Sequence, residues 1–189
     1  MRILLVAFAL LIQFSWVIFA QEDISKPVSV KLDSIFHLFQ ETLKKPYPDF
    51  TAISLTGDAI TEKDLLGKVT FIDFWFTYCS PCVAAFGDIE NLYKNLKDNH
   101  KFQFVSFCTD PIKMATESAK KYQLPYSVYP ISRQQFPTLL LSGFPFMLIV
   151  NEEGKIIYYK TGGFSEKVSS ERTKEFQNIE NILMTELSK

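Results

Sequence analysis

Two cysteines separated by two residues, Cys79 and Cys82, are the most informative chemical feature of the chain. Thiols at this spacing close one small disulfide and open it again, which is the basis of thiol–disulfide exchange. The same spacing supplies half of a zinc site, but zinc takes about four ligands. Cys108, His37 and His100 are the remaining thiol and imidazole groups, and none of them forms a second ligand couple. We therefore expect redox chemistry, with no metal and no cofactor.

The two cysteines stand at a predicted junction between a strand and a helix. The apolar run 69–78 precedes them and is typical of a buried strand. A helix N-terminus lowers the pKa of a thiol through its unpaired N–H groups and the positive end of its dipole. Pro81 suits a first helical turn, where its missing N–H loses no intrahelical partner. The expected helix carries apolar side chains at helical spacing, namely Phe86, Ile89, Tyr93 and Leu96.

Asp73 interrupts the apolar run six positions before Cys79. We expect it to be buried, and burial raises the pKa of a carboxyl group towards the range that suits proton transfer. The alternative is a carboxylate that is held by a hydrogen bond or faces water at an edge. We interpret Asp73 as a candidate catalytic residue.

The third cysteine, Cys108, ends the apolar run 102–107. Free cysteine is among the most buried residue types, so a packed structural thiol is the preferred interpretation over a resolving role. A static disulfide between Cys79 and Cys82 is also an alternative, but it would close so small a loop that little chain entropy is gained.

Composition and the N-terminus limit the other possibilities. The chain has 189 residues, 47% of them hydrophobic, and a formal net charge of -1, so we expect one main domain and no nucleic-acid partner. Residues 1–20 combine Arg2, an apolar run and a polar segment after Ala20, as a secretory signal peptide does. Ile18 makes the cleavage site imperfect, which leaves an uncleaved membrane anchor open. Either way we expect an exported protein in the periplasm or another extracytoplasmic space.

The remaining chain alternates strand and helix patterns, which predicts an α/β fold. Residues 21–45 form an extension whose pattern fits a short strand or a helix, and 46–189 form the domain. The predicted elements are a hairpin over 50–61, a helix over 113–122, an extended piece at 127–131, a distorted turn at 134–141, a hairpin over 144–159, and a C-terminal helix lined by Phe176, Ile179, Leu183 and Leu187.

Several of these motifs occur in the order found in the thioredoxin superfamily. Asp-Phe-Trp precedes the Cys-x-Pro-Cys motif, Gly-Phe-Pro opens a later strand, and Asn-Glu-Glu-Gly-Lys forms a hairpin turn. With Pro48-Asp49-Phe50 and the segment 65–68, the region from about 46 to 187 resembles the exported TlpA/ResA-like thiol-disulfide oxidoreductases. The resemblance implies a thioredoxin-like fold, with a central mixed sheet flanked by helices and an N-terminal hairpin extension.

The same resemblance implies roles for individual residues. Cys79 matches an exposed attacking thiol, Cys82 the buried resolving thiol, and Asp73 the buried aspartate that helps to deprotonate it. Pro145 matches a cis-proline that faces the two cysteines and offers backbone to an extended substrate segment. The predicted substrate contacts are Phe144, Pro145, Tyr78 and Pro81.

The chain departs from this family at two helix positions. Relatives commonly place Glu three residues and Pro five residues after the second cysteine, where this chain has Ala85 and Gly87. More of the proton handling therefore falls on Asp73. Tyr78 also stands where Trp is common.

The function indicated by these features is thiol-disulfide oxidoreductase, reducing disulfides in exported proteins with electrons from a membrane thiol carrier. A Sco-like copper or assembly factor is one alternative, but it requires Cys-x-x-x-Cys and a downstream histidine ligand. A thiol peroxidase of the same fold is another, but it requires Thr or Ser three residues before the cysteine, whereas Thr77 lies two before Cys79. The spacing leaves the redox potential open, because the superfamily spans about -270 to -120 mV.

Overall fold

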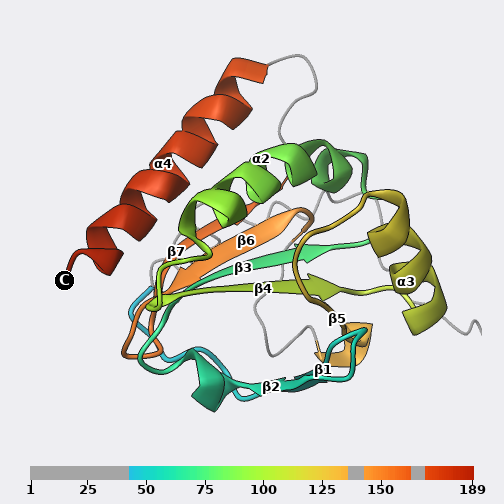
Figure 1. Cartoon of the computed structure of the whole chain (residues 1–189), viewed down its shortest axis with the longest axis horizontal. Coiled ribbons are helices and arrows are strands. Elements are labelled where there is room, and N and C mark those ends of the chain that lie inside the picture. Colours follow the sequence, from blue (N-terminus) through green and yellow to red (C-terminus); the bar gives the residue numbers. More distant parts are fainter. Residues whose placement is uncertain (1–42, 136–142, 163–168) are drawn as a thin grey trace, which may run out of the picture.

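A computed structural model describes residues 43–135, 143–162 and 169–189 of the chain. The expected signal peptide 1–20, nearly all of the extension 21–45 and most of the predicted turn 134–141 lie outside the described residues. The described part contains a sheet with the strand order β5-β4-β3-β6-β7 (Figure 1). Its strands are β3 (Val69–Trp75), β4 (Phe102–Cys108), β5 (Val128–Pro130), β6 (Phe146–Val150) and β7 (Ile156–Thr161).

The sheet is mixed, as predicted. Strand β3 pairs in parallel with β4, which pairs in parallel with β5, whereas β6 is antiparallel to both β3 and β7. Parallel neighbours need crossover connections, here the helices α2 (Ser80–Leu96) and α3 (Ile112–Lys121). The C-terminal helix α4 (Ser169–Leu187) lies alongside α2 (Figure 1). The predicted helices and the hairpin β6–β7 are therefore confirmed.

The two faces of the sheet bury two different cores, because side chains alternate along a strand. Phe71 and Trp75 of β3 pack under the helices, together with buried residues of α2, α3 and α4. Ile72 and Phe74 face the opposite side and pack against the N-terminal part of the domain. The alternation places Asp73 on the helix face.

The N-terminal hairpin covers the second face (Figure 1). Strands β1 (Thr51–Ile53) and β2 (Ala59–Thr61) pair antiparallel, and the 3-10 helix η1 (Glu62–Leu65) leads from them towards β3. The Leu55 N–H donates to the carbonyl of Val128 at 2.9 Å, which joins the hairpin to the edge strand β5. The predicted hairpin extension is thus confirmed.

Two further predicted elements are shorter than expected. The extended piece at 127–131 is the three-residue strand β5, and the described part of 134–141 contributes only to the 3-10 helix η2 (Arg133–Gln135). Among the helices that the structure describes, none is both long enough and apolar enough to cross a membrane.

Candidate active site

The two cysteines lie where β3 gives way to α2. A tight turn follows β3 and is closed by a hydrogen bond from the Cys79 N–H to the carbonyl of Phe76 at 3.0 Å. Cys79 then caps α2: its Sγ accepts a hydrogen bond from the Cys82 N–H at 3.2 Å, and Pro81 occupies the first helical turn. The side chains of Cys79 and Cys82 form a disulfide, with their Cα atoms 5.2 Å apart. We call these two residues the redox pair.

Both sulfurs of the redox pair are covered in this oxidised form. Cys82 is 1% exposed, as expected for the second cysteine, but Cys79 is only 4% exposed. The expectation of an exposed Cys79 is therefore wrong for the disulfide form. The reason is local: the bond to Cys82 and the hydrogen bond from its N–H draw the Cys79 side chain onto the first turn of α2, where it joins the helix-side core.

A pocket of about 400 Å³ lies beside Cys79. Tyr78 and Ser80, the chain neighbours of Cys79, both line it, and Tyr78 is 78% exposed. The remaining lining comes from the same turn, from α2 and from the residue after α3, and consists of Thr77, Val83, Ala84 and Tyr122. The lining is apolar and hydroxylic, and contains no carboxylate or amine.

Asp73 is buried beneath the helices, as predicted. It is 1% exposed, and in the sheet it lies between Ser106 of β4 and Met147 of β6. Its Oδ2 atom is buried without a hydrogen-bond partner in the structure. Burial raises the pKa of Asp73 to about 8, against a smaller opposing effect of the Phe74 backbone N–H. Ala85, the position where the family resemblance leads one to expect Glu, is a buried residue of α2 and supplies no acid.

Two of the predicted substrate contacts, Phe144 and Pro145, belong to the loop before β6. The Phe144–Pro145 peptide bond is cis, in agreement with the resemblance. The rings of Phe144 and Phe76 meet edge to face with their centroids 5.0 Å apart, which places the loop before β6 against the turn that leads to the redox pair. The carbonyl of Pro145 accepts a hydrogen bond from the Gly162 N–H at 3.0 Å. Pro145 is buried, whereas Phe144 and Pro81 are partly exposed.

Cys108 is a fully buried free thiol at the end of β4, which confirms its predicted packing. Burial is the main cause that raises the pKa of Cys108 to about 12, and the nearby Asp110 carboxylate also contributes. The Cys108 Sγ lies 3.8 Å from Oδ2 of Asp110, to which it donates. Within the described ranges, no three His, Cys, Asp or Glu side chains cluster in a way that could hold a metal ion.

Sequence reasoning missed a set of polar residues that fixes the turn before Cys79. Oδ2 of Asp110 accepts hydrogen bonds from the N–H of Thr77 at 2.6 Å and from its hydroxyl. The Thr77 hydroxyl also meets that of Ser118, a buried residue of α3, at 2.9 Å. The missed signal is register: Thr77 and Asp110 each stand two positions beyond the end of a strand, and parallel strands end at one edge.

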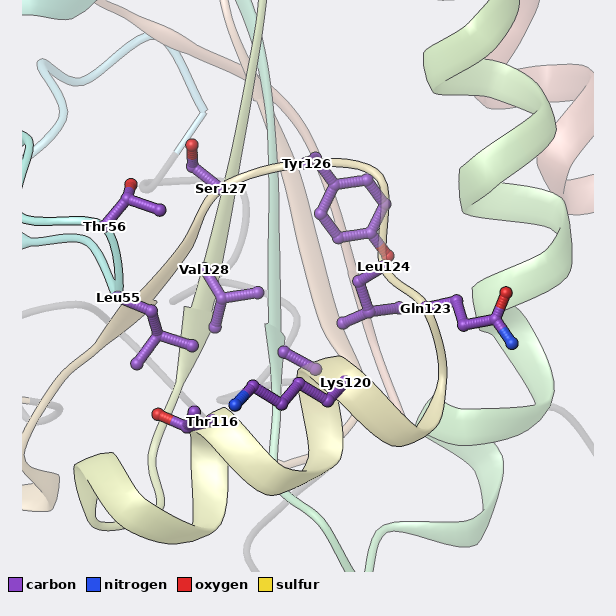
Figure 2. A pocket seen from close by; sticks show the side chains of 10 residues that line it. Leu55, Thr56, Thr116, Lys120, Gln123, Leu124, Tyr126, Ser127 and Val128 are labelled. Carbon is purple, nitrogen blue, oxygen red and sulfur yellow. The ribbon is translucent and has the colours of Figure 1, made fainter.

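A larger pocket than the one beside Cys79 lies elsewhere. It has a volume of about 460 Å³ and sits between the hairpin turn, α3 and β5 (Figure 2). Leu55, Leu124 and Val128 give it an apolar floor, and the Lys120 side chain reaches across it. No residue of the redox pair lines this pocket, so size alone does not locate the chemistry.

Comparison with known proteins supports the same chemistry. The Redoxin family matches residues 42–183. The thiol-disulfide oxidoreductase ResA of Bacillus subtilis (strain 168) is 30% identical over 123 residues, which cover 64% of this chain and 68% of ResA. A ResA of Bacillus cereus is 28% identical over 133 residues, covering 69% of this chain and 72% of the relative.

Solved structures agree on the fold. A crystal structure from Chlorobium tepidum, assigned as a thiol:disulfide interchange protein DsbE, has a TM-score of 0.65 at 24% identity and covers 75% of this chain and 97% of that one. The thioredoxin domain of a thiol-disulfide oxidoreductase from Bacteroides vulgatus has a TM-score of 0.62 at 22% identity, with the same coverage. The chain therefore belongs to the Redoxin family, within the thioredoxin superfamily, and is a TlpA/ResA-like thiol-disulfide oxidoreductase.

Proposed function

We propose that the redox pair reduces disulfides in exported proteins, with Cys79 as the attacking thiol and Cys82 as the resolving thiol. The observation that carries this assignment is the hydrogen bond from the Cys82 N–H to the Cys79 Sγ at the N-terminus of α2. In the reduced protein the same N–H and the helix dipole would stabilise a Cys79 thiolate, whereas Cys82 lies inside the first turn and is the more deeply buried of the two.

The reaction then has two exchange steps. The Cys79 thiolate attacks one sulfur of the substrate disulfide, a mixed disulfide forms, and the other substrate sulfur leaves as a thiolate. Cys82 loses its proton and attacks the Cys79 sulfur, which closes the 79–82 disulfide and releases the second substrate thiolate. The substrate gains two electrons and the redox pair loses two. A dithiol donor must reduce the pair again, and we propose a membrane thiol carrier for this step.

Asp73 is proposed as the base that takes the Cys82 proton. It faces the layer that contains α2, and its Oδ2 has no competing partner in the described structure. With its pKa raised to about 8, about one Asp73 side chain in ten is ionised at pH 7, so the group titrates close to working pH. The absence of an acid at Ala85 makes this role more important here than in relatives that carry Glu.

Substrate binding is proposed at the residues that flank the turn. Phe144 and Pro145 would meet an extended substrate segment on one side of Cys79, and Tyr78 and Pro81 would meet it on the other. The strong exposure of Tyr78 supports this, as does the Phe76–Phe144 contact. Export rests on the signal-like segment 1–20 and includes membrane anchoring if that segment is retained.

The proposal is tested by trapping substrates in cells that express the full-length chain. Cys82→Ser should accumulate mixed disulfides through Cys79, because the resolving thiol is missing, and the captured proteins should carry export signals. Cys79→Ser, the matched control, should capture none. Equal trapping by both variants, or capture of proteins without export signals, would contradict the assignment. The reduction potential of the purified full-length chain against glutathione decides direction: a value near about -270 mV favours a reductase, and one near about -120 mV an oxidant.

A further inference from the structure

The ends of β3 and β4 are joined by a carboxylate. Trp75 and Cys108 are partners in the parallel register, so Thr77 and Asp110 emerge two residues later at the same edge of the sheet. There the Asp110 Oδ2 accepts a hydrogen bond from the Thr77 N–H at 2.6 Å and a second from the Thr77 hydroxyl. These bonds connect the β4–α3 junction to the turn that leads into the redox pair.

The turn is held from both sides. Its own bond, from the Cys79 N–H to the carbonyl of Phe76, closes it across Thr77 and Tyr78. The Asp110 carboxylate holds the backbone of Thr77, and the hydroxyl of Ser118 on α3 contacts the Thr77 hydroxyl at 2.9 Å. Hydrogen bonds to a carboxylate are about twice as strong as neutral ones. The backbone just before Cys79 is therefore fixed to two other elements of the fold.

This restraint has a direct consequence for Cys79. The Cys79 Sγ accepts the Cys82 N–H at 3.2 Å only while its backbone enters α2 in the present direction. Opening the disulfide removes the covalent link between the two side chains, so the hydrogen bonds of the turn then contribute more to holding Cys79 in place. A turn that loses Asp110 would let the Cys79 thiolate move away from the helix N-terminus that stabilises it.

We propose that Asp110 is a positioning residue for the redox reaction, and that it acts through Thr77 by holding the turn that presents Cys79 to the N-terminus of α2. The inference rests on the proposed attack by Cys79. Asp110 touches neither sulfur of the redox pair in the described structure; its contacts are Thr77 and the buried Cys108 thiol.

The Asp110 charge has an opposing effect that must be separated from positioning. A negative charge near Cys79 disfavours the thiolate, so its removal alone would lower the pKa of Cys79. The pocket beside Cys79 contributes no carboxylate or amine, and the phenols of Tyr78 and Tyr122 are its titratable groups. Thr77→Val removes the hydroxyl bonds and keeps the Asp110 charge, whereas Asp110→Asn removes the charge and keeps an acceptor.

The experiment compares four variants of the full-length chain in the reduced state. The pH profile of Cys79 alkylation is followed by peptide mass spectrometry, and the reduction potential is measured against glutathione. Thr77→Val should move the alkylation midpoint upwards, slow labelling at pH 7 by about fivefold and make the potential more negative, because the thiolate is less stabilised. Asp110→Asn should change both in the same direction by a smaller factor. Thr77→Ser, which restores the hydroxyl, and Glu117→Gln, which removes an exposed charge of α3, should match the wild-type protein.

Two results would overturn the inference. If Asp110→Asn lowers the alkylation midpoint while Thr77→Val leaves it unchanged, Asp110 acts through its charge alone. If Thr77→Val and Asp110→Asn both melt at a lower temperature but keep the wild-type reduction potential and alkylation profile, the Thr77–Asp110 hydrogen bonds serve stability only. A failure of the proposed function gives a different signature: the wild-type protein would then be labelled first at Cys82, whatever the variants do.

Discussion

Two cysteines lie near the neighbouring ends of β3 and β4, and their surroundings have opposite effects on the thiol. Cys79 follows β3, and Cys108 ends β4. Both strands are parallel and buried, and Trp75 stands beside Cys108 in the register. After β3 the chain makes a turn and starts a helix at Cys79, so that sulfur meets a helix N–H. In β4 the thiol is Cys108 itself, inside the sheet, where burial raises its pKa to about 12. The same residue type is made exchangeable or inert by the backbone that surrounds it.

Comparing Cys79 with Cys108 indicates that burial alone does not decide whether a thiol is reactive. Cys79 is 4% exposed and Cys108 is fully buried, so exposure alone hardly distinguishes them. The difference lies in the electrostatic surroundings: Cys79 caps a helix, while Cys108 faces the Asp110 carboxylate and lies within the influence of Asp73. A thiolate is therefore favoured at the first site and opposed at the second.

The largest expected effect comes from removing the attacking thiol. Cys79→Ser should abolish reduction of a protein disulfide by the full-length chain, because no other thiol is placed to begin the exchange. The measurement is turnover with a dithiol donor in excess, with Cys108→Ala as the matched control that keeps the redox pair. Residual turnover in Cys79→Ser would mean that Cys82 or Cys108 can attack, and that the two environments differ less than their surroundings indicate.

The second-largest expected effect tests whether the buried Asp73 carboxyl takes part in the reaction of the redox pair. Asp73→Asn should slow resolution of the mixed disulfide by about 10²-fold near neutral pH, since general base catalysis typically contributes that much or more. The first attack by Cys79 should change less. In the wild-type protein the resolution rate should rise with pH and level off above about 8, the pKa to which burial raises Asp73. Superimposable pH profiles in single-turnover experiments would make Asp73 a structural residue.

Asp73 should also make the free energy of unfolding depend on pH, in a direction that follows from its raised pKa. Burial raises the pKa of Asp73 to about 8 in the folded chain, whereas the unfolded chain titrates near about 3.9. Between these pH values the folded state binds the extra proton, so this group makes the free energy of unfolding fall as pH rises from about 4 to about 8. Relative to wild type, Asp73→Asn should gain up to about 1.4 kcal/mol per pH unit across this window. Denaturant titrations at several pH values provide the measurement, and a difference that is independent of pH would contradict the raised pKa.

We expect the smallest effect from replacing Cys108, the buried thiol outside the redox pair. Cys108→Ala should keep wild-type turnover and lower the free energy of unfolding by about 1 kcal/mol, as is typical when a small buried group is lost. Mass spectrometry of the oxidised protein should find Cys108 unpaired. A disulfide from Cys108 to either residue of the redox pair would make it a third redox residue and remove the contrast between the two strand ends.

Much of the fold follows from local patterns. The apolar run that forms β3, the helical spacing after Cys82 and the Asn-Glu-Glu-Gly turn are short-range signals, and the structure confirms the element that each one predicts. The turn is well marked because Gly154 adopts a positive φ of 73°, which glycine tolerates without strain. Element bounds were less predictable: the run 69–78 continues past the strand, which ends at Trp75.

The candidate site, like the fold, was only partly predictable from the sequence. Its redox pair was predictable because Cys79 and Cys82 lie close together in the sequence, at the start of one helix. The exposure of Cys79 was not readable, because it depends on the bond that draws the sulfur onto α2. The Thr77–Asp110–Ser118 set was also missed, since Asp110 and Ser118 are 33 and 41 residues from Thr77 along the chain.

By itself, then, the sequence determined the redox chemistry, the succession of strands and helices, and the burial of Asp73 and Cys108, because spacing, periodicity and apolar context are local properties. Tertiary structure decided which polar groups meet at the edge where β3 and β4 end, and how far the disulfide is covered. The physical reason is that the parallel register brings distant segments to one edge, where hydrogen bonds and burial depend on positions in space.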